Sequence, residues 1–307
     1  LPWRMGPCRD QDLATPRLTL AEGSRSIKNK TGTLSYSQAM NRSTFAWLKQ
    51  RVPPAARPRL QAAPPVALGA ERLDSALFGG LAAGALHEIY ARRGADAAAA
   101  AGFAAALSRR AAARRPILWI AQDFIARETG RLHAPGLAQF GLDPAAFVEV
   151  EGRDALAVLR AGADAARCAA LGAVVIALWG PSRLYDLTAT RRLSLAAAES
   201  GVPVFALHIA AEPKPSAAAT RWAVESAPSR AREARAPGDP RFALSLLRHR
   251  GGIDADRWPE MQIVEWNRER ECFTDVESAA PIAAGGREPP LSGAVVSLPA
   301  DRSAEAR

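Results

Sequence analysis

The stretch GALHEIYARRGADAAAAAGFAAAL, residues 84–107, decides the fold of this chain. Its first part, Leu86–Ala91, alternates like a strand. After a short turn, Asp96 stands where it can cap a helix that runs to about Ala113. A strand, a tight turn and a helix of more than ten residues form the first unit of an α/β fold.

Strands and helices keep alternating downstream of this unit. The run AVVIAL, residues 173–178, is the most apolar and is expected at the centre of the sheet. Further strands are predicted at 117–121, 147–150 and 202–209, and helices at 154–171, with Asp154 as the cap, and at 188–200. This alternation predicts a doubly wound, mainly parallel sheet with helices on both faces over residues 67–215.

The pattern changes after Pro215. Residues 219–225 and 261–267 predict strands, Phe242–Arg250 predicts a short helix, and the Pro-, Arg- and Ser-rich residues 226–240 between them predict a loop. We therefore expect a short β-containing extension over 216–277. Residues 278–307 are rich in Gly, Pro and Ala and are expected to be disordered.

The N-terminal arm differs from the rest of the chain. Residues 1–39 show no apolar period and begin with Leu1, so we expect Met40 to be the natural start and 1–39 to be a non-native or disordered leader. A helix is predicted after Met40, followed by a proline-rich tether, together spanning 40–66. Its apolar face would carry Phe45, Trp47, Leu48 and Val52.

So short a helix is marginal in water unless it docks. The docking surface is either its own domain or a partner, which includes another copy of the chain.

Composition narrows the class of protein. The net charge is +9, but residues 1–70 hold 11 cations against 3 anions, so most of the excess lies in the N-terminal arm. The longest purely apolar stretch, residues 97–107, is too short to span a bilayer. Cys8, Cys168 and Cys272 are far apart and offer neither a disulfide framework nor a metal-ligand pair. We expect a cytoplasmic protein without metal.

The turn at residues 91–98 stands where a nucleotide-binding protein carries its phosphate loop. The lead-in LDSALFGGLAAGALHEIYA, residues 73–91, resembles that of RecA-like ATPases, which continues into G-x-x-x-x-G-K-[ST]. Here Ala91 and Asp96 replace the glycines, Ala97 replaces the lysine and Ala98 replaces the hydroxyl. A carboxylate at the start of the helix would also repel a phosphate.

The other acidic elements of an ATPase are missing too. Strand 173–178 ends without a carboxylate for magnesium, and only Asp123 could orient a water. The resemblance therefore predicts a RecA-like fold without nucleotide, cofactor or catalytic residues. Two alternatives stay open: an ordinary strand–turn–helix that never bound nucleotide, and a cryptic ATPase that uses Arg92 or Arg93 in place of the lysine.

The order of further blocks resembles the ImuA family, the RecA-like accessory proteins of damage-inducible mutagenesis. The blocks are TFAWL (44–48), GGL-x-x-GALHEIYA (79–91), ILWI (117–120), PGL (135–137), FGLDP (140–144), RRLSLAA (191–197), Pro203-Val204, ATRW (219–222), SAPS (226–229) and LRHRGG (247–252). The resemblance covers roughly residues 40–267. It implies a non-catalytic adaptor of SOS-induced translesion DNA synthesis that works with ImuB, an error-prone polymerase and RecA.

A different class of function shares this degenerate core, namely a cell-division inhibitor of the SulA kind. The docking helix and the C-terminal strands favour ImuA, because a division inhibitor needs little beyond the core.

Single-stranded DNA contact is a weaker expectation. Arg221, Arg248 and Arg250 could bind phosphates while Trp222 stacks on a base. Trp222 in an alternating strand is also a typical core residue. His87 and Glu88 are adjacent on a strand, so their side chains should point to opposite faces and form no acid–base pair.

Overall fold

The computed structural model describes residues 64–232, 236, 238–252, 258 and 261–276, and the backbone of three short strands near the N-terminus. These strands are β1 (Arg17–Thr19), β2 (Ile27–Asn29) and β3 (Gly32–Leu34). The predicted docking helix with Phe45, Trp47, Leu48 and Val52, the tether up to residue 63, and the tail at 278–307 lie outside the described residues, as does most of the predicted leader.

The fold is built on one large sheet with the strand order β1-β6-β5-β7-β8-β4-β9-β10-β11-β12. Its central strands are all parallel: β4 (Leu86–Ala91), β5 (Ile117–Gln122), β6 (Phe147–Gly152), β7 (Ala173–Trp179), β8 (Val204–Ile209) and β9 (Thr220–Ala227). β7 lies inside the sheet between β5 and β8, as its apolar sequence predicts. The mainly parallel α/β sheet is therefore confirmed.

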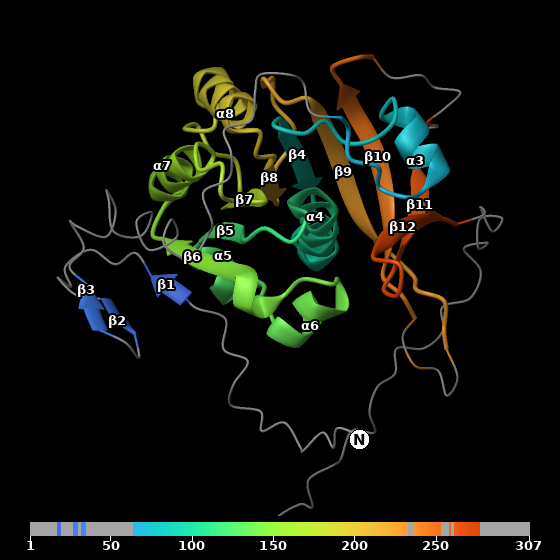
Figure 1. The fold of residues 1–307 in the computed structure, drawn as a ribbon, viewed down its shortest axis with the longest axis horizontal. Coiled ribbons are helices and arrows are strands. Elements are labelled where there is room, and N and C mark those ends of the chain that lie inside the picture. Colours follow the sequence, from blue (N-terminus) through green and yellow to red (C-terminus); the bar gives the residue numbers. More distant parts are fainter. Residues whose placement is uncertain are drawn as a thin grey trace, which may run out of the picture. The chain divides into compact units, whose positions relative to one another are not determined.

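Helices cover both faces of this sheet (Figure 1). α4 (Ala97–Ala112), α5 (Asp123–Glu128) and α6 (Ala134–Gln139) lie on one face. α7 (Ala155–Ala165) and α8 (Leu187–Ser200) lie on the other face. The short helix α3 (Glu71–Ala76) packs beside β12. The doubly wound arrangement follows because the crossovers from β4 to β5, β5 to β6, β6 to β7 and β7 to β8 each carry a helix, whereas residues 210–219 connect β8 to β9 without one.

Two helix ends follow the signals that the sequence predicts, the start of α7 and the end of α8. The Asp154 carboxylate accepts a hydrogen bond from the Ala157 amide at 2.8 Å, and α8 ends at Gly201, whose φ of +74° suits a residue without a side chain. α7 stops at Ala165, earlier than predicted, because the amide of Cys168 bonds back only three residues to the Ala165 carbonyl. This tighter turn ends the helix.

Within the described residues, the C-terminal extension contains an element whose predicted type is wrong. Phe242–Arg250 is not a helix; β10 spans Arg241–His249 and pairs antiparallel with β9 on one side and with β11 (Gln262–Asn267) on the other. Phe242, Leu244 and Leu246 alternate into the core. The apolar pattern of this segment fits both a helix and a strand, and pairing with its neighbours in the sheet made it a strand. β12 (Cys272–Asp275) completes this antiparallel part of the sheet.

Small side chains let α4 lie close to the sheet. Ala100, Ala104 and Ala106 are fully buried, and Phe103 projects from the same helix into an aromatic cluster. The Phe103 ring meets Trp222 of β9 edge-on, with 5.9 Å between ring centroids. This packing joins the C-terminal strands to the rest of the core.

Candidate functional site

The turn at the end of β4 has the strand–turn–helix geometry that the sequence predicts. Ala91 closes the strand, a 3₁₀ turn covers Gly94–Asp96, and α4 starts at Ala97. Ala91 and Ala97 are buried, whereas Ala98 is exposed. The residues in the positions of the phosphate loop are therefore placed together, but none of these alanine side chains can bind a phosphate or a magnesium ion.

The Asp96 side chain does not cap α4, so this prediction is wrong. Its carboxylate accepts no hydrogen bond from α4; it accepts from Arg93 Nε at 2.8 Å and from the Ser226 amide and hydroxyl at 3.1 and 3.2 Å. Burial by itself raises the pKa of Asp96, but the hydrogen bonds from Arg93 and Ser226 outweigh it, so the pKa lies below its usual value. The turn thus holds a fixed negative charge tied to β9.

An aromatic side chain lies beside this turn. Trp179 ends β7, and its indole packs so close to Gly94 that a Cβ there would lie 3.4 Å from Trp179 Cη2. The same indole meets Phe124 edge-on at 5.7 Å, and the Trp179 amide donates to Gln122 Oε1 at 2.7 Å. The strand end that would need a carboxylate for magnesium therefore carries an indole against the turn.

Asp123, the acid that could orient a water, is paired instead with Arg127 one helical turn further along α5.

Removing the Asp96 carboxylate is expected to destabilise the fold. Asp96→Ala should lower the free energy of unfolding by about 1–3 kcal/mol, because the Ser226 amide would lose its acceptor. The folded-state pKa is lowered, so this contribution is present above the ordinary pKa of about 4 and disappears as the pH falls below it. Urea unfolding at pH 7 and pH 3 checks both points. Asp123→Ala, which breaks an exposed pair, is the matched control and should change stability little.

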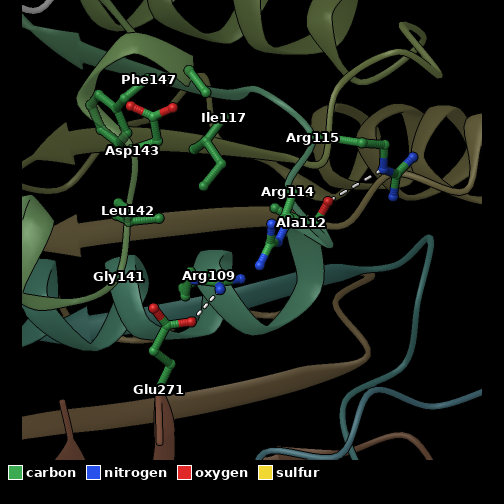
Figure 2. A pocket seen from close by; sticks show the side chains of 11 residues that line it. Arg109, Ala112, Arg114, Arg115, Ile117, Gly141, Leu142, Asp143, Phe147 and Glu271 are labelled. Atoms are coloured by element: carbon green, nitrogen blue, oxygen red, sulfur yellow. Dashed lines mark hydrogen bonds and ion pairs between the residues drawn. The ribbon is translucent and has the colours of Figure 1, made fainter. Parts of the chain in front are cut away.

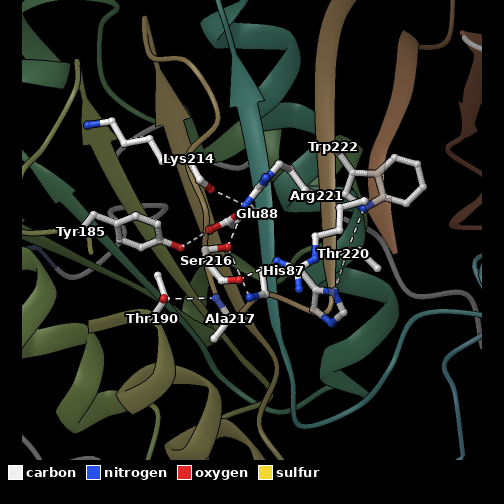
Figure 3. A network of polar contacts seen from close by, with 12 residues as sticks. His87, Glu88, Tyr185, Thr190, Lys214, Ser216, Ala217, Thr220, Arg221 and Trp222 are labelled. Carbon is white, nitrogen blue, oxygen red and sulfur yellow. Dashed lines mark hydrogen bonds and ion pairs between the residues drawn. The ribbon is translucent and has the colours of Figure 1, made fainter. Parts of the chain in front are cut away.

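A second polar cluster lies on the opposite face of the sheet, the face that carries α7 and α8 (Figure 3). Glu88 of β4 has no solvent exposure, and its carboxylate accepts from the Tyr185 hydroxyl at 2.9 Å and from Arg221 Nε at 2.7 Å. Burial, and then the charge of Glu88, raise the pKa of Tyr185, so its hydroxyl stays protonated and donates. Arg221 also donates to Ser216 Oγ at 2.9 Å.

His208 of β8 lies next to this cluster. Its ring stacks on Tyr90 with 4.6 Å between centroids and meets Tyr185 edge-on at 4.4 Å. Its Nε2 is buried without a hydrogen-bond partner. Burial, and then the charges of Arg221 and Lys214, lower the pKa of His208 to about 3.

His87 and Glu88 point to opposite faces, as predicted from their adjacency on a strand. His87 Nε2 lies 2.9 Å from the Ala82 carbonyl, which can only accept, so Nε2 carries the proton and Nδ1 accepts from the Thr220 hydroxyl at 2.8 Å. Trp222 Nε1 in turn donates to Thr220 Oγ1 at 3.1 Å. Burial lowers the pKa of His87 to about 4. Both residues are therefore fixed in separate buried contacts.

The candidate DNA-binding residues do not form one exposed surface. Trp222 is fully buried, so it is not available to stack on a base. The alternative interpretation, that Trp222 is a core residue of an alternating strand, is confirmed. The Arg221 guanidinium is bound by Glu88. Arg248 donates to the Ser216 carbonyl at 2.5 Å and Arg250 to the Ala217 carbonyl at 3.0 Å. These arginines hold the segment before β9 in place.

The described residues contain no cluster of three or more His, Cys, Asp or Glu side chains that could hold a metal ion. In the same part of the chain, no helix is both long and apolar enough to cross a bilayer. Sequence reasoning missed the Glu88–Arg221 ion pair and the hydrogen bonds that link Trp222 through Thr220 to His87. In both cases β4 and β9 supply partners that lie more than a hundred residues apart.

The chain matches no protein-family model and no curated protein. Among solved structures it is similar to the RadB recombinase, with 19% sequence identity and a TM-score of 0.45, over 69% of this chain and 100% of that chain. The fold class stated above rests on the strand order and the helix layers of the chain itself.

Proposed function

We propose that this chain is a non-catalytic, RecA-like accessory protein of SOS-induced error-prone translesion DNA synthesis. It would act as an adaptor that joins an ImuB-like polymerase homologue, an error-prone polymerase and RecA. The turn after β4 supports the absence of ATPase activity. The Asp96 carboxylate lies where a phosphate loop would bind phosphate, and Trp179 ends the strand that would need a carboxylate for magnesium. The order of sequence blocks that resembles the ImuA family supports the pathway.

The contacts of the two arginines in the turn weigh against a cryptic ATPase. Arg93 pairs with Asp96 and, at 3.4 Å, with Glu225, while Arg92 lies 3.5 Å from Glu212. A triphosphate would have to compete with these carboxylates for either cation. A phosphate-binding loop offers free backbone amides and an uncommitted lysine instead.

The face that carries α7 and α8 supports an adaptor role. A groove of about 350 Å³ between these helices is lined by leucines that include Leu156 and Leu184, which are 39% and 48% exposed. Arg160 and Arg192 line the same groove and form no ion pair with a described residue, whereas Asp186, the other charged residue of the lining, accepts a hydrogen bond from the Ala189 amide at 2.7 Å. Exposed apolar side chains in a cluster commonly mark protein contacts. The two arginines suit an acidic, apolar segment of a partner protein.

A pull-down with the full chain from DNA-damaged cells of the source organism tests the proposal. It should recover the ImuB-like homologue and the error-prone polymerase, and the double substitution Leu156→Asp/Leu184→Asp should abolish that recovery. Met261→Asp changes another exposed apolar side chain, 53% exposed and outside this groove, and is the control. A version without residues 40–60 shows which partner needs the predicted helix. Truncations at the other end should begin at residue 277, because β9–β12 belong to the core.

Two results would contradict the proposal. One is recovery of a tubulin-like division protein instead of a polymerase homologue. The other is magnesium-dependent ATP binding at micromolar concentration, measured by calorimetry on the same full chain.

A further inference from the structure

Helix α8 carries a row of three exposed residues on the side that faces away from the sheet. Arg191, Leu195 and Glu199 follow one another at intervals of four residues, so they are neighbours along one side of the helix. The opposite side, with Leu193 and Ala197, is buried against the sheet. We call Arg191, Leu195 and Glu199 the α8 ridge.

The two charges of the α8 ridge have no partner among the described residues. Elsewhere, Figure 2 shows Arg109 of α4 paired with Glu271, where both line a cleft of about 300 Å³. The side chains of Arg191 and Glu199, by contrast, form no hydrogen bond or ion pair with a described residue. They stand about 12 Å apart along the axis of one helix, which is too far for them to pair with each other.

Glu199 lies at an unfavourable place for a carboxylate. It is the last residue but one of α8, and the last turn of this helix contains no basic residue. The carbonyl groups at a helix C-terminus carry partial negative charge, which repels a carboxylate nearby. A cation from outside α8 would offset this repulsion.

Leu195 stands between the two charges. It is 63% exposed, and no large apolar side chain of the described residues is more exposed. Ala198, one turn further along α8, is exposed as well and has only a methyl group. A second helix could therefore approach this side of α8 to the usual distance of about 8–10 Å and cover Leu195.

We propose that the α8 ridge is an interface between two copies of this chain. The two α8 helices pair antiparallel about a twofold axis at Leu195. Each Arg191 then meets Glu199 of the second copy, because both charges lie about 6 Å from Leu195 along the helix, on opposite sides of it. A twofold interface must be self-complementary, and arginine, leucine and glutamate at equal spacing have this property.

Charge also excludes the other orientation of the two helices. A parallel pair would place arginine beside arginine and glutamate beside glutamate, which is destabilising. Two ion pairs around one leucine contact form a small interface, so the dimer should be weak, with a Kd of about 10 μM. The inference is independent of the proposed function, because the pull-down can succeed with a monomer or a dimer.

Sedimentation velocity of the full chain, from about 1 to 200 μM, tests the interface. A concentration-dependent equilibrium between monomer and dimer is expected. Leu195→Asp places two carboxylates at the twofold axis and should weaken dimerisation at least tenfold. Arg270→Glu is the matched control, because it reverses an exposed arginine that also forms no ion pair with a described residue but lies in the turn after β11. It should dimerise like the parent chain.

Reversal of the charges tests the antiparallel arrangement. Arg191→Glu alone makes two carboxylates face each other, and Glu199→Arg alone makes two guanidinium groups do so, so each should weaken dimerisation at least tenfold. The double substitution Arg191→Glu/Glu199→Arg should restore it, because antiparallel helices again bring opposite charges together. This recovery also shows that the single variants did not fail through unfolding.

Three results would overturn the proposal. The first is a parent chain that stays monomeric up to about 200 μM. The second is a dimer that Leu195→Asp leaves unchanged, since the copies would then meet through another surface. The third is a double charge reversal that dimerises no better than the single ones.

Discussion

Acidification from pH 7 to pH 4 is expected to remove roughly 6 kcal/mol of folding stability from this protein, about 3 kcal/mol for each of two buried histidines. The cause is the burial of two neutral histidines, His87 and His208, whose pKa values fall from 6.5 to about 4 and about 3. Below pH 6.5 the unfolded chain binds a proton at each ring and the folded chain does not. Stability therefore falls with the pH until the folded-state pKa values are reached.

The two rings resist protonation for different local reasons. The lone pair on His87 Nδ1 already accepts from the Thr220 hydroxyl, so a proton there would break this hydrogen bond. His208 lies between Tyr90 and Tyr185 with no acceptor near Nε2, and the charge of Arg221 opposes a second cation. A charged ring in either place would be buried without a counterion.

Urea unfolding at several pH values between 4 and 7 measures the effect. His208→Phe keeps an aromatic ring between the two tyrosines and should remove about half of the pH dependence. His133→Gln changes an exposed histidine and is the matched control. A stability that is constant between pH 7 and pH 4 would show that the two rings titrate equally in the folded and unfolded chains.

The substitution Glu88→Ala is expected to lower the free energy of unfolding by about 3–5 kcal/mol. Glu88 is completely buried and the Arg221 side chain is 12% exposed, so the guanidinium would keep its charge without an anionic partner and retain only neutral acceptors such as Ser216 Oγ. The Tyr185 hydroxyl would lose its acceptor as well. Breaking one side of a buried pair costs more than the pair contributes, because desolvation of the remaining charge is no longer offset.

Two variants distinguish the buried charge from the hydrogen bond. Glu88→Gln retains an acceptor for Tyr185 but loses the charge, so its cost should be smaller than that of alanine. Glu225→Ala removes a carboxylate that is 50% exposed and pairs with Arg93, and it should change stability by less than about 1 kcal/mol. If Glu88→Ala unfolds at the same urea concentration as the parent chain, the cluster contributes nothing to the fold.

The sequence by itself determined the order and type of most elements. Alternation placed β4, apolar runs placed strands such as β5 and β7, and local signals such as Asp154 and Gly201 indicated where α7 begins and α8 ends. It also determined that residues 91–98 lack the side chains of a phosphate loop. These inferences succeeded because periodicity, capping and residue type act over a few neighbouring positions.

Where a local sequence pattern allowed two structures, only the tertiary structure decided which one formed. The apolar residues of Phe242–Arg250 fit both the helical and the strand period, and pairing with β9 and β11 made the segment a strand. Asp96 could cap α4, but Ser226, 130 residues away, supplies better donors for its carboxylate. Trp222 could face DNA or the core, and its contact with Phe103 buried it. In each case the partner is distant in the chain, and the free energy gained by burying or pairing the side chain exceeds its local preference.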